Sequence, residues 1–361
     1  MRHFFSRRTT LAVTAVGASA ALLVACSEPA EDTATTAAET TAAENGTAST
    51  AAATGETTTI TVYTSEPEEK VDEINAAFEA ANPDIKVEVY RAGTGDLNAR
   101  IAAEKESGSI EADVLWAADS ATFETYKAAG DLAELQDVDT ADLIEEAVDA
   151  DNHYVGTRII PTVIAYNTDI IDEADAPQSW ADLVDPKYAG QLVMPDPAVS
   201  GAAAFNASVW KNDEQLGEDW INTLGENQPM IAQSNGPTSQ EIAGGGHPVG
   251  VVVDYLIRDL ADAGSPVAAV YPTEGAPYIT EPAGVFEASD NKEAAERYIN
   301  FLLSEEGQQI AVEQAYLPVR EDVGTPEGTP PLHEIALMTP DLQVVTDDKD
   351  AAVELFQNAM Q

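Results

Sequence analysis

Short polar loops at the starts of expected helices carry most of the ligand chemistry that this sequence offers. A helix N-terminus presents free N–H groups and a partial positive charge that attract anions, and ligands of open α/β sheets bind at such loops. Four loops, at 63–66, 92–95, 117–120 and 196–201, follow expected strands in this way. An ordinary helix cap would explain any one of them, but four together favour a pocket. The predicted ligand-binding residues in these loops are Ser65, Glu66, Thr94, Gly95, Asp119, Ser120, Ser200 and Gly201.

Three further residues extend the predicted pocket. Asp254 and Tyr255 end the last strand of the second half of the chain, where they could project a carboxylate and a phenol toward a ligand. Glu274 lies in a later extended segment that would form a wall of the same pocket. Three arginines near these segments are candidate anion clamps, although a surface ion pair would also explain each of them. They are Arg91, Arg158 and Arg258.

Catalytic motifs find no match in this sequence. The four histidines stand far apart, and no HExxH, GxSxG, P-loop or strand-following GxGxxG pattern occurs. We therefore predict a binding protein that is not an enzyme and holds no cofactor.

The charge of the chain is strongly negative. Its 361 residues include 64 acidic and 17 basic side chains, which gives a formal net charge of −47. Such a surface repels a polyanion, so nucleic acid is not expected as a partner. The acidity is typical of a halophilic or salt-tolerant surface, whose self-repulsion is screened by salt. A cationic ligand is the alternative explanation.

The N-terminal residues predict an export signal. Arginines at positions 2, 7 and 8 precede an uncharged run at 11–25, which ends in the sequence LVAC with Cys26 as its last residue. This sequence resembles the bacterial lipobox, which implies a signal peptide over 1–26 and a lipid on Cys26. An unmodified cysteine within a cleaved signal is the alternative, and both the Sec and the twin-arginine routes stay open. Residues 27–57 are rich in Ala, Thr and Glu and predict a disordered tether.

Alternating strands and helices follow the tether. Alternating β-branched residues predict a strand at 59–63, and Ser65 with Glu68 forms a capping box for the next helix. Further strands are expected at 85–90 and 112–117, and further helices at 96–106 and 120–129. This order is typical of an α/β architecture with a largely parallel sheet.

A second α/β unit begins after an extended stretch at 154–167. It contains expected strands at 192–194 and 249–254, and expected helices at 200–209 and 213–224. A second extended stretch at 267–286 leads into an amphipathic helix at 292–303. Two units joined by two extended crossings predict two lobes with two hinge strands and a ligand cleft between them. The expected parts are 58–158 and 271–325 for the first lobe, 159–270 for the second, and 326–361 for C-terminal helices packed on the body.

Several short motifs together resemble a known family. They are ITVYTS at 60–65, GTGDL at 93–97, ADVLW at 112–116, Asp196-Pro197 with Ser200-Gly201, PTEG at 272–275 and FLLSEEGQ at 301–308. Over 59–323 the chain resembles the solute-binding lipoproteins of ABC importers, in the group labelled iron(III)-binding. The resemblance implies the two-lobe periplasmic-binding-protein type 2 fold and a monomer on the outer face of the cell membrane. It also implies that the lobes close on a small solute, which then passes to a membrane permease driven by an ATPase.

The resemblance leaves more than one ligand open. Ferric binders of this group carry two adjacent tyrosines, whereas Asp254 and Tyr255 stand at the matching positions here. Those two residues could still hold transported Fe³⁺ through oxygen, which is the alternative. Relatives that share the Gly-Thr-Gly loop and the Ser-Gly helix start are similar to binders of phosphonates or sugar phosphates, and both features suit a phosphate. An organic phosphonate or phosphate ester is therefore expected, while thiamine-like and polyamine ligands stay open.

Overall fold

The computed structural model describes residues 57–361. The predicted signal peptide, the lipidation site Cys26 and the tether up to residue 56 lie outside these residues. Within the described part of the chain, no helix is long and apolar enough to span a membrane.

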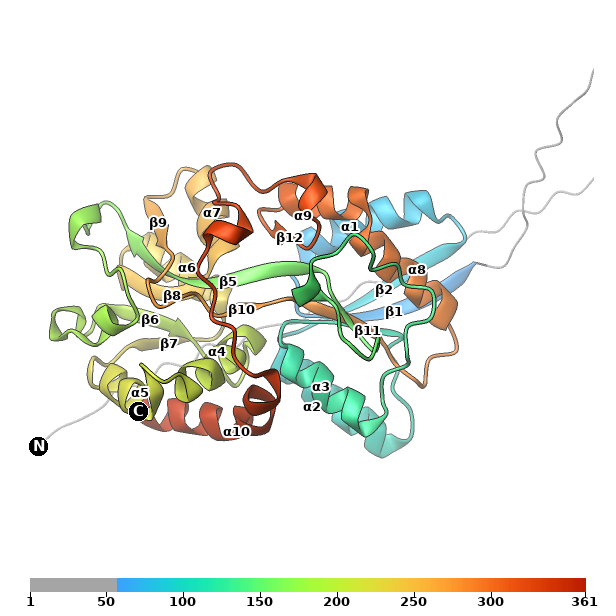
Figure 1. The fold of residues 1–361 in the computed structure, drawn as a ribbon, viewed down its shortest axis with the longest axis horizontal. Helices are drawn as coiled ribbons and strands as arrows, with labels where there is room; N and C mark the ends of the chain where they lie inside the picture. The colour runs from blue at the N-terminus through green and yellow to red at the C-terminus, as the bar shows by residue number, and fades with distance from the viewer. Residues whose placement is uncertain (1–56) are drawn as a thin grey trace, which may run out of the picture. The chain divides into compact units, whose positions relative to one another are not determined.

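The first lobe is built on a five-stranded sheet (Figure 1). In the sheet the strands lie in the order β2-β1-β3-β11-β4, with β1 parallel to β2 and β3, and β11 antiparallel to β3 and β4. The strands are β1 (Thr58–Thr64), β2 (Ile85–Arg91), β3 (Val114–Trp116), β4 (Val155–Gly156) and β11 (Pro282–Val285). The helices that accompany them are α1 (Glu68–Ala81), α2 (Thr94–Ser107), α3 (Ser120–Ala129), α8 (Lys292–Leu303) and α9 (Glu305–Glu313).

The second lobe surrounds one long strand, β5 (Arg158–Asn167), every residue of which is buried. Strand β8 pairs with β5 and continues the sheet through β6 to β7, while β9, β10 and β12 also pair with β5. These strands are β6 (Leu192–Pro195), β7 (Met230–Ala232), β8 (Val249–Val253), β9 (Val267–Val270), β10 (Tyr278–Ile279) and β12 (Leu317–Pro318). The helices are α4 (Gly201–Asn212), α5 (Gly217–Glu226), α6 (Asn235–Gly244) and α7 (Asp254–Asp262).

Short 3₁₀ helices complete the secondary structure. They lie at Glu145–Ala147, Glu173–Asp175, Ala181–Val184, Pro186–Tyr188, Glu321–Val323 and Leu332–Glu334.

Two crossings connect the lobes and form the hinge. The chain leaves the first sheet at β4 and enters the second at β5, and it returns from β10 to β11. The return falls at 280–281, because β10 still pairs with β5. Side chains alternate along these strands, so Ile160 and Ile279 face the cleft described below. Their neighbours Ile159 and Tyr278 line a separate hollow of about 560 Å³.

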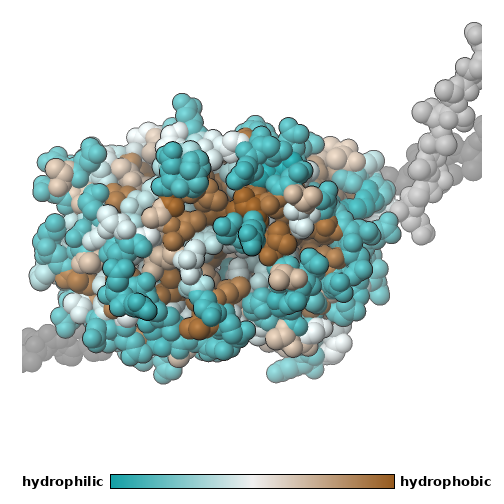
Figure 2. Space-filling view, viewed as in Figure 1, coloured by the Kyte–Doolittle hydropathy of each residue, from teal (hydrophilic) through white to brown (hydrophobic). Residues whose placement is uncertain are grey.

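The surface of the described chain is largely hydrophilic. Figure 2 shows hydrophilic residues over most of one face and a band of hydrophobic residues across its middle. This distribution agrees with the strong excess of acidic side chains in the sequence.

The C-terminal segment contributes one long helix, α10 (Leu342–Ala359), which packs on α4 and α5 (Figure 1). Ser208 Oγ donates to the carbonyl oxygen of Val345 at 3.0 Å, and Lys211 Nζ lies 2.7 Å from Asp348 Oδ2. The same helix also contacts α3 of the first lobe.

One local prediction is wrong. Pro67 is the N-cap of α1 and no side chain caps that helix, so the expected capping box does not form. Ser65 Oγ instead accepts a hydrogen bond from the backbone N–H of Ala118 at 3.0 Å, which joins the ends of β1 and β3. Neither β7 nor α6 is expected from the sequence, because β7 has only three residues and α6 opens with Asn235-Gly236-Pro237, a pattern typical of a turn.

Candidate binding cleft

A cleft of about 380 Å³ lies between the lobes and is lined by residues of both. A cavity of this size suits a small organic molecule. The first lobe contributes Ser65, Glu66, Pro67, Arg91, Gly93, Thr94 and Ala118. The second lobe contributes Val199–Ala202, Ser234–Pro237 and Val253 with Tyr255 and Leu256, and the hinge contributes Ile160, Ile279 and Glu281.

Three helices begin at this cleft. The first residues of α2, α4 and α6 are Thr94, Gly201 and Asn235, and all three line the cavity. Their free N–H groups and the aligned helix dipoles therefore favour an anion. Thr94 Oγ1 is buried and has no hydrogen-bond partner in the protein, so a polar ligand group would satisfy it.

Ser200 links two of these helix starts. Its Oγ caps α4 by accepting from the N–H of Ala203 at 3.3 Å, and it also accepts from Asn235 Nδ2 at 2.9 Å. Asn235 Oδ1 in turn accepts from the N–H of Val253 at 3.2 Å. Since the hydroxyl of Ser200 accepts both bonds, its own hydrogen is left to donate to a ligand.

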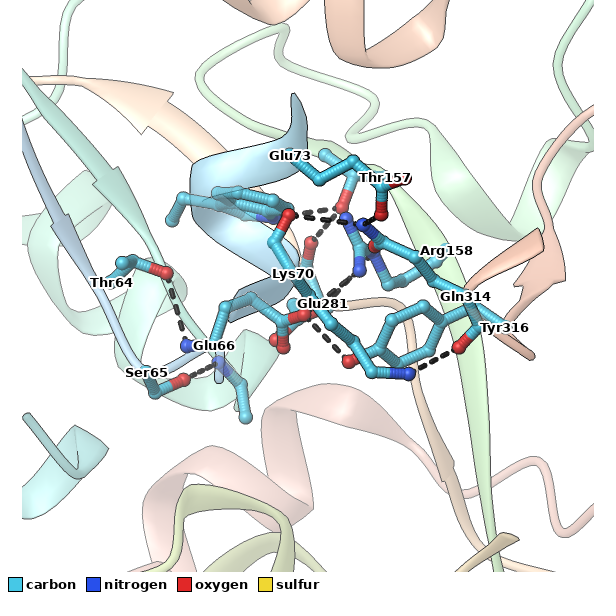
Figure 3. Close-up of polar contacts among 12 residues, drawn as sticks. Thr64, Ser65, Glu66, Lys70, Glu73, Thr157, Arg158, Glu281, Gln314 and Tyr316 are labelled. Carbon is cyan, nitrogen blue, oxygen red and sulfur yellow. Dashed lines mark hydrogen bonds and ion pairs between the residues drawn. The ribbon is translucent and has the colours of Figure 1, made fainter. Parts of the chain in front are cut away.

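A buried ionic cluster forms the hinge side of the cleft (Figure 3). Arg158 Nη1 donates to Glu66 Oε2 at 2.8 Å, and Tyr316 Oη donates to the same oxygen at 2.7 Å. Arg158 Nε also lies 3.3 Å from Glu281 Oε2. At most 4% of any of these four side chains is exposed, so the charges interact with little screening by water.

Burial and charge act differently on the two carboxyl groups. Burial raises the pKa of Glu66, but the positive charge of Arg158, the hydrogen bonds with Glu281 and Tyr316 and the charge of Lys70 together outweigh that effect, so the pKa is lowered overall. Burial, together with the negative charge of Glu66, raises the pKa of Glu281 well above its ordinary value. The cluster therefore favours the charged form of Glu66 and the protonated form of Glu281.

Lys70 joins α1 of the first lobe to α7 of the second. Its Nζ lies 2.9 Å from Asp259 Oδ2 and donates to the carbonyl oxygen of Gln314. The same ammonium lies 4.7 Å from the ring centroid of Tyr255 and 4.6 Å from that of Tyr316. The two rings are themselves 4.3 Å apart, so Lys70 makes cation–π contacts with both at the edge of the cleft.

The structure brings together six of the residues predicted to bind ligand. Ser65, Glu66, Thr94, Ser200, Gly201 and Tyr255 all line the cleft. Of the three arginines, only Arg91 lines it, and its Nε donates to the backbone oxygen of Glu66 at 2.9 Å.

Asp254 and Glu274 were expected to face the cleft but do not line it, because each carboxylate has other partners. Asp254 Oδ2 lies 2.6 Å from Arg258 Nη1 and accepts from Tyr271 Oη at 3.0 Å. Glu274 accepts from the backbone N–H groups of Trp180 and Ala181 at 3.1 and 3.0 Å.

The other three predicted residues lie beside the cleft lining. Asp119 is 1% exposed and bonds to Lys349 of α10, which also bonds to Thr122. Ser120 Oγ lies 3.3 Å from Thr280 Oγ1 and lines a separate small hollow. Gly95 packs against the backbone of the second lobe at 198–199.

Comparison of the sequence with known proteins finds a matching family model and several related proteins. A family model described as bacterial extracellular solute-binding protein matches residues 73–336. An uncharacterized protein of Haemophilus influenzae is 26% identical over 247 residues, which cover 64% of this chain and 69% of that protein. The spermidine/putrescine-binding periplasmic protein of Escherichia coli K12 is 28% identical over 219 residues, which cover 58% of each chain. The match thus spans little more than half of the E. coli protein.

Solved structures confirm the predicted two-lobe fold. Iron-bound HitA of Pseudomonas aeruginosa superposes with a TM-score of 0.75 at 24% identity, covering 84% of this chain and 100% of that one. AfuA of Actinobacillus pleuropneumoniae, with fructose-6-phosphate bound, superposes with a TM-score of 0.74 at 21% identity, covering 83% and 98%. The match to the family model extends over most of the described residues, and the chain therefore belongs to the family of bacterial extracellular solute-binding proteins.

Proposed function

We propose that this solute-binding protein of an ABC importer captures an organic phosphonate or a phosphate ester and delivers it to the permease and its ATPase. The observation that carries the proposal is the meeting of three helix N-termini, those of α2, α4 and α6, in one cleft beside the unpartnered hydroxyl of Thr94. Backbone N–H groups at helix starts bind phosphate oxygens in many unrelated proteins. Arg91 at the rim adds a positive charge, and a phosphate ester is the ligand of the similar AfuA structure.

Two-lobe closure gives the capture its physical basis. Residues of both lobes line the cleft, so a bound solute stabilises the closed state more than the open one. The closed state is then the form that a permease can distinguish from the empty receptor.

Ferric iron receives less support from the same residues. Lys70 and Arg158 both make cation–π contacts with the Tyr316 ring, and Lys70 makes a further one with Tyr255. Burial raises the pKa of the Tyr255 phenol well above its ordinary value, which opposes a phenolate ligand. Asp254 is already bound to Arg258. Within residues 57–361, moreover, no cluster of three or more His, Cys, Asp or Glu side chains is placed to hold a metal ion.

Thermal unfolding in the presence of single compounds tests the proposed ligand class. Methylphosphonate or fructose 6-phosphate is expected to raise the melting temperature, because a ligand at about 100 times its dissociation constant stabilises the folded state by about 2.7 kcal/mol. Ferric citrate, thiamine and spermidine serve as comparison compounds in low and high salt. A shift with one of these three and none with phosphonates or phosphate esters would overturn the proposed ligand.

We further propose that a lipid on Cys26 holds the protein at the outer face of the cell membrane. The basic residues, apolar run and LVAC sequence of the N-terminus support this proposal. Labelled palmitate fed to producing cells is expected to appear in the protein and to be absent from the Cys26→Ser variant. Equal labelling of the two chains would contradict the anchor.

A further inference from the structure

The two lobes meet backbone to backbone at three glycines beside the cleft. Gly95 N–H in the first lobe lies 3.4 Å from the carbonyl oxygen of Val199 in the second. A Cβ built on Gly95 would lie 2.2 Å from the carbonyl oxygen of Ala198, and one on Gly93 would lie 2.9 Å from that of Val199. From the other side, a Cβ on Gly201 would lie 2.6 Å from Thr94 Oγ1. None of these distances is tolerated by a real Cβ atom.

Local backbone conformation does not explain these glycines. Gly93 has a φ of −64°, and neither Gly95 nor Gly201 has a positive φ. Gly95 and Gly201 lie in the first turns of α2 and α4, where alanine would favour the helix more than glycine does. What excludes a side chain at these positions is the opposite lobe.

We propose that Gly93, Gly95 and Gly201 form a closure seam that sets how far the lobes can approach. The inference rests on the proposed function, since it gives closure a role in solute capture. Contact at the seam brings the first turns of α2 and α4 to the same cavity, so that one solute can bind both helix starts. The carbonyl oxygens of the second lobe belong to the backbone and cannot rotate away, so a methyl group at Gly95 is relieved only by lobe separation.

Gly95 separates closure from solute contact better than the other two glycines. Gly93 and Gly201 line the cleft, whereas Gly95 does not. The atoms that a Cβ on Gly95 would meet all belong to the second lobe, so lobe separation removes the clash and Gly95→Ala is expected to fold. The variant is therefore expected to keep its unfolding midpoint and to lose access to the closed state. Its dissociation constant should rise at least about tenfold, because apparent affinity falls with the fraction of molecules that can close.

Distances between spin labels on the two lobes test the seam directly. In a Cys26→Ser background, the exposed residues Glu106 of the first lobe and Glu214 of the second are replaced by cysteine and labelled. Distance distributions are recorded alone and with methylphosphonate, fructose 6-phosphate, ferric citrate, thiamine or spermidine. The Gly95→Ala variant is compared with Gly244→Ala, whose added methyl group meets open space.

The expected result is a distinct closed-state distance with at least one compound in the parent chain and in Gly244→Ala, but with none in Gly95→Ala. Closure of Gly95→Ala to the same distance as the parent would overturn the seam. If only spermidine or ferric citrate closes the parent chain, the proposed ligand is overturned. Comparison of the parent with Gly95→Ala in that compound then still tests the closure seam. If none of the compounds closes the parent chain, both the closure seam and the proposed ligand are overturned.

Discussion

Replacing Arg158 with methionine is expected to lower the free energy of unfolding by about 3–5 kcal/mol, the usual cost of breaking a buried ion pair. The guanidinium lies between Glu66 and Glu281, and all three side chains are almost fully buried. Its removal leaves charged Glu66 without a cation at 2.8 Å, and the carboxyl group of Glu281 cannot supply a positive charge in its place. Equilibrium unfolding in guanidinium chloride measures the loss.

A surface arginine provides the matched control for this prediction. Arg297 pairs with Asp84 at 2.8 Å, but 39% and 56% of the two side chains are exposed. Arg297→Met is therefore expected to cost about 1 kcal/mol or less. Adding Glu66→Gln and Glu281→Gln to Arg158→Met should recover part of the lost stability, because the buried charge disappears with the arginine. An Arg158→Met chain as stable as Arg297→Met would show that the cluster contributes little.

Replacing Gly236 with aspartate is expected to weaken binding of a phosphonate or phosphate ester on the order of 100-fold. Gly236 lines the cleft in the first turn of α6, and a side chain built there meets no atom within 4 Å. A carboxylate at this position suits the helix start but repels an anionic solute. Two like charges about 4 Å apart near a protein surface repel by up to about 4 kcal/mol, and exposure to water reduces that value.

Gly236→Asn separates charge from volume in the same experiment. Asparagine has nearly the size of aspartate and no charge, so it should change the dissociation constant much less. A cationic solute would instead bind Gly236→Asp more tightly than Gly236→Asn. Isothermal titration of both variants with the same solute measures the difference, and equal affinity for the two would exclude an anionic group near α6.

Two of the three helix starts of the cleft, those of α2 and α4, could be predicted from the sequence, because their signals are local. Thr94 and Gly201 each follow a strand within a short loop, and the helix pattern follows directly. The expectation that Asp254 faces the cleft is wrong, although the partner that holds its carboxylate is close in sequence. Arg258 stands four residues further along the same helix, a spacing at which opposite charges pair, so the ion pair could have been expected.

The hinge cluster could not be predicted in the same way, because its contacts join distant parts of the chain. Tyr316 lies 250 residues from Glu66, and β12 brings the two together by pairing with β5. Lys70 stands on an amphipathic helix, where an exposed lysine is the ordinary expectation. Asn235 opens a helix whose next residues are glycine and proline, which predict a turn.

Tertiary packing alone determines which of the four predicted loops line the cleft. The residues at 94 and 201 face each other across the lobes and share one cavity. Asp119 and Ser120 begin an equally regular helix, but α10 and the hinge cover them. A contact with a helix 230 residues away leaves no trace in the local sequence.

The structure of the protein with the bound phosphonate or phosphate ester that raises its melting temperature most is the most direct test of the proposed ligand. The phosphorus atom is predicted to lie in the cleft, with its oxygens within hydrogen-bond distance of Thr94 and of the first N–H groups of α4 and α6. The lobes should touch at Gly95 as they do here. A phosphorus atom elsewhere in the molecule, or a metal ion bound by Tyr255 in its place, would contradict the account.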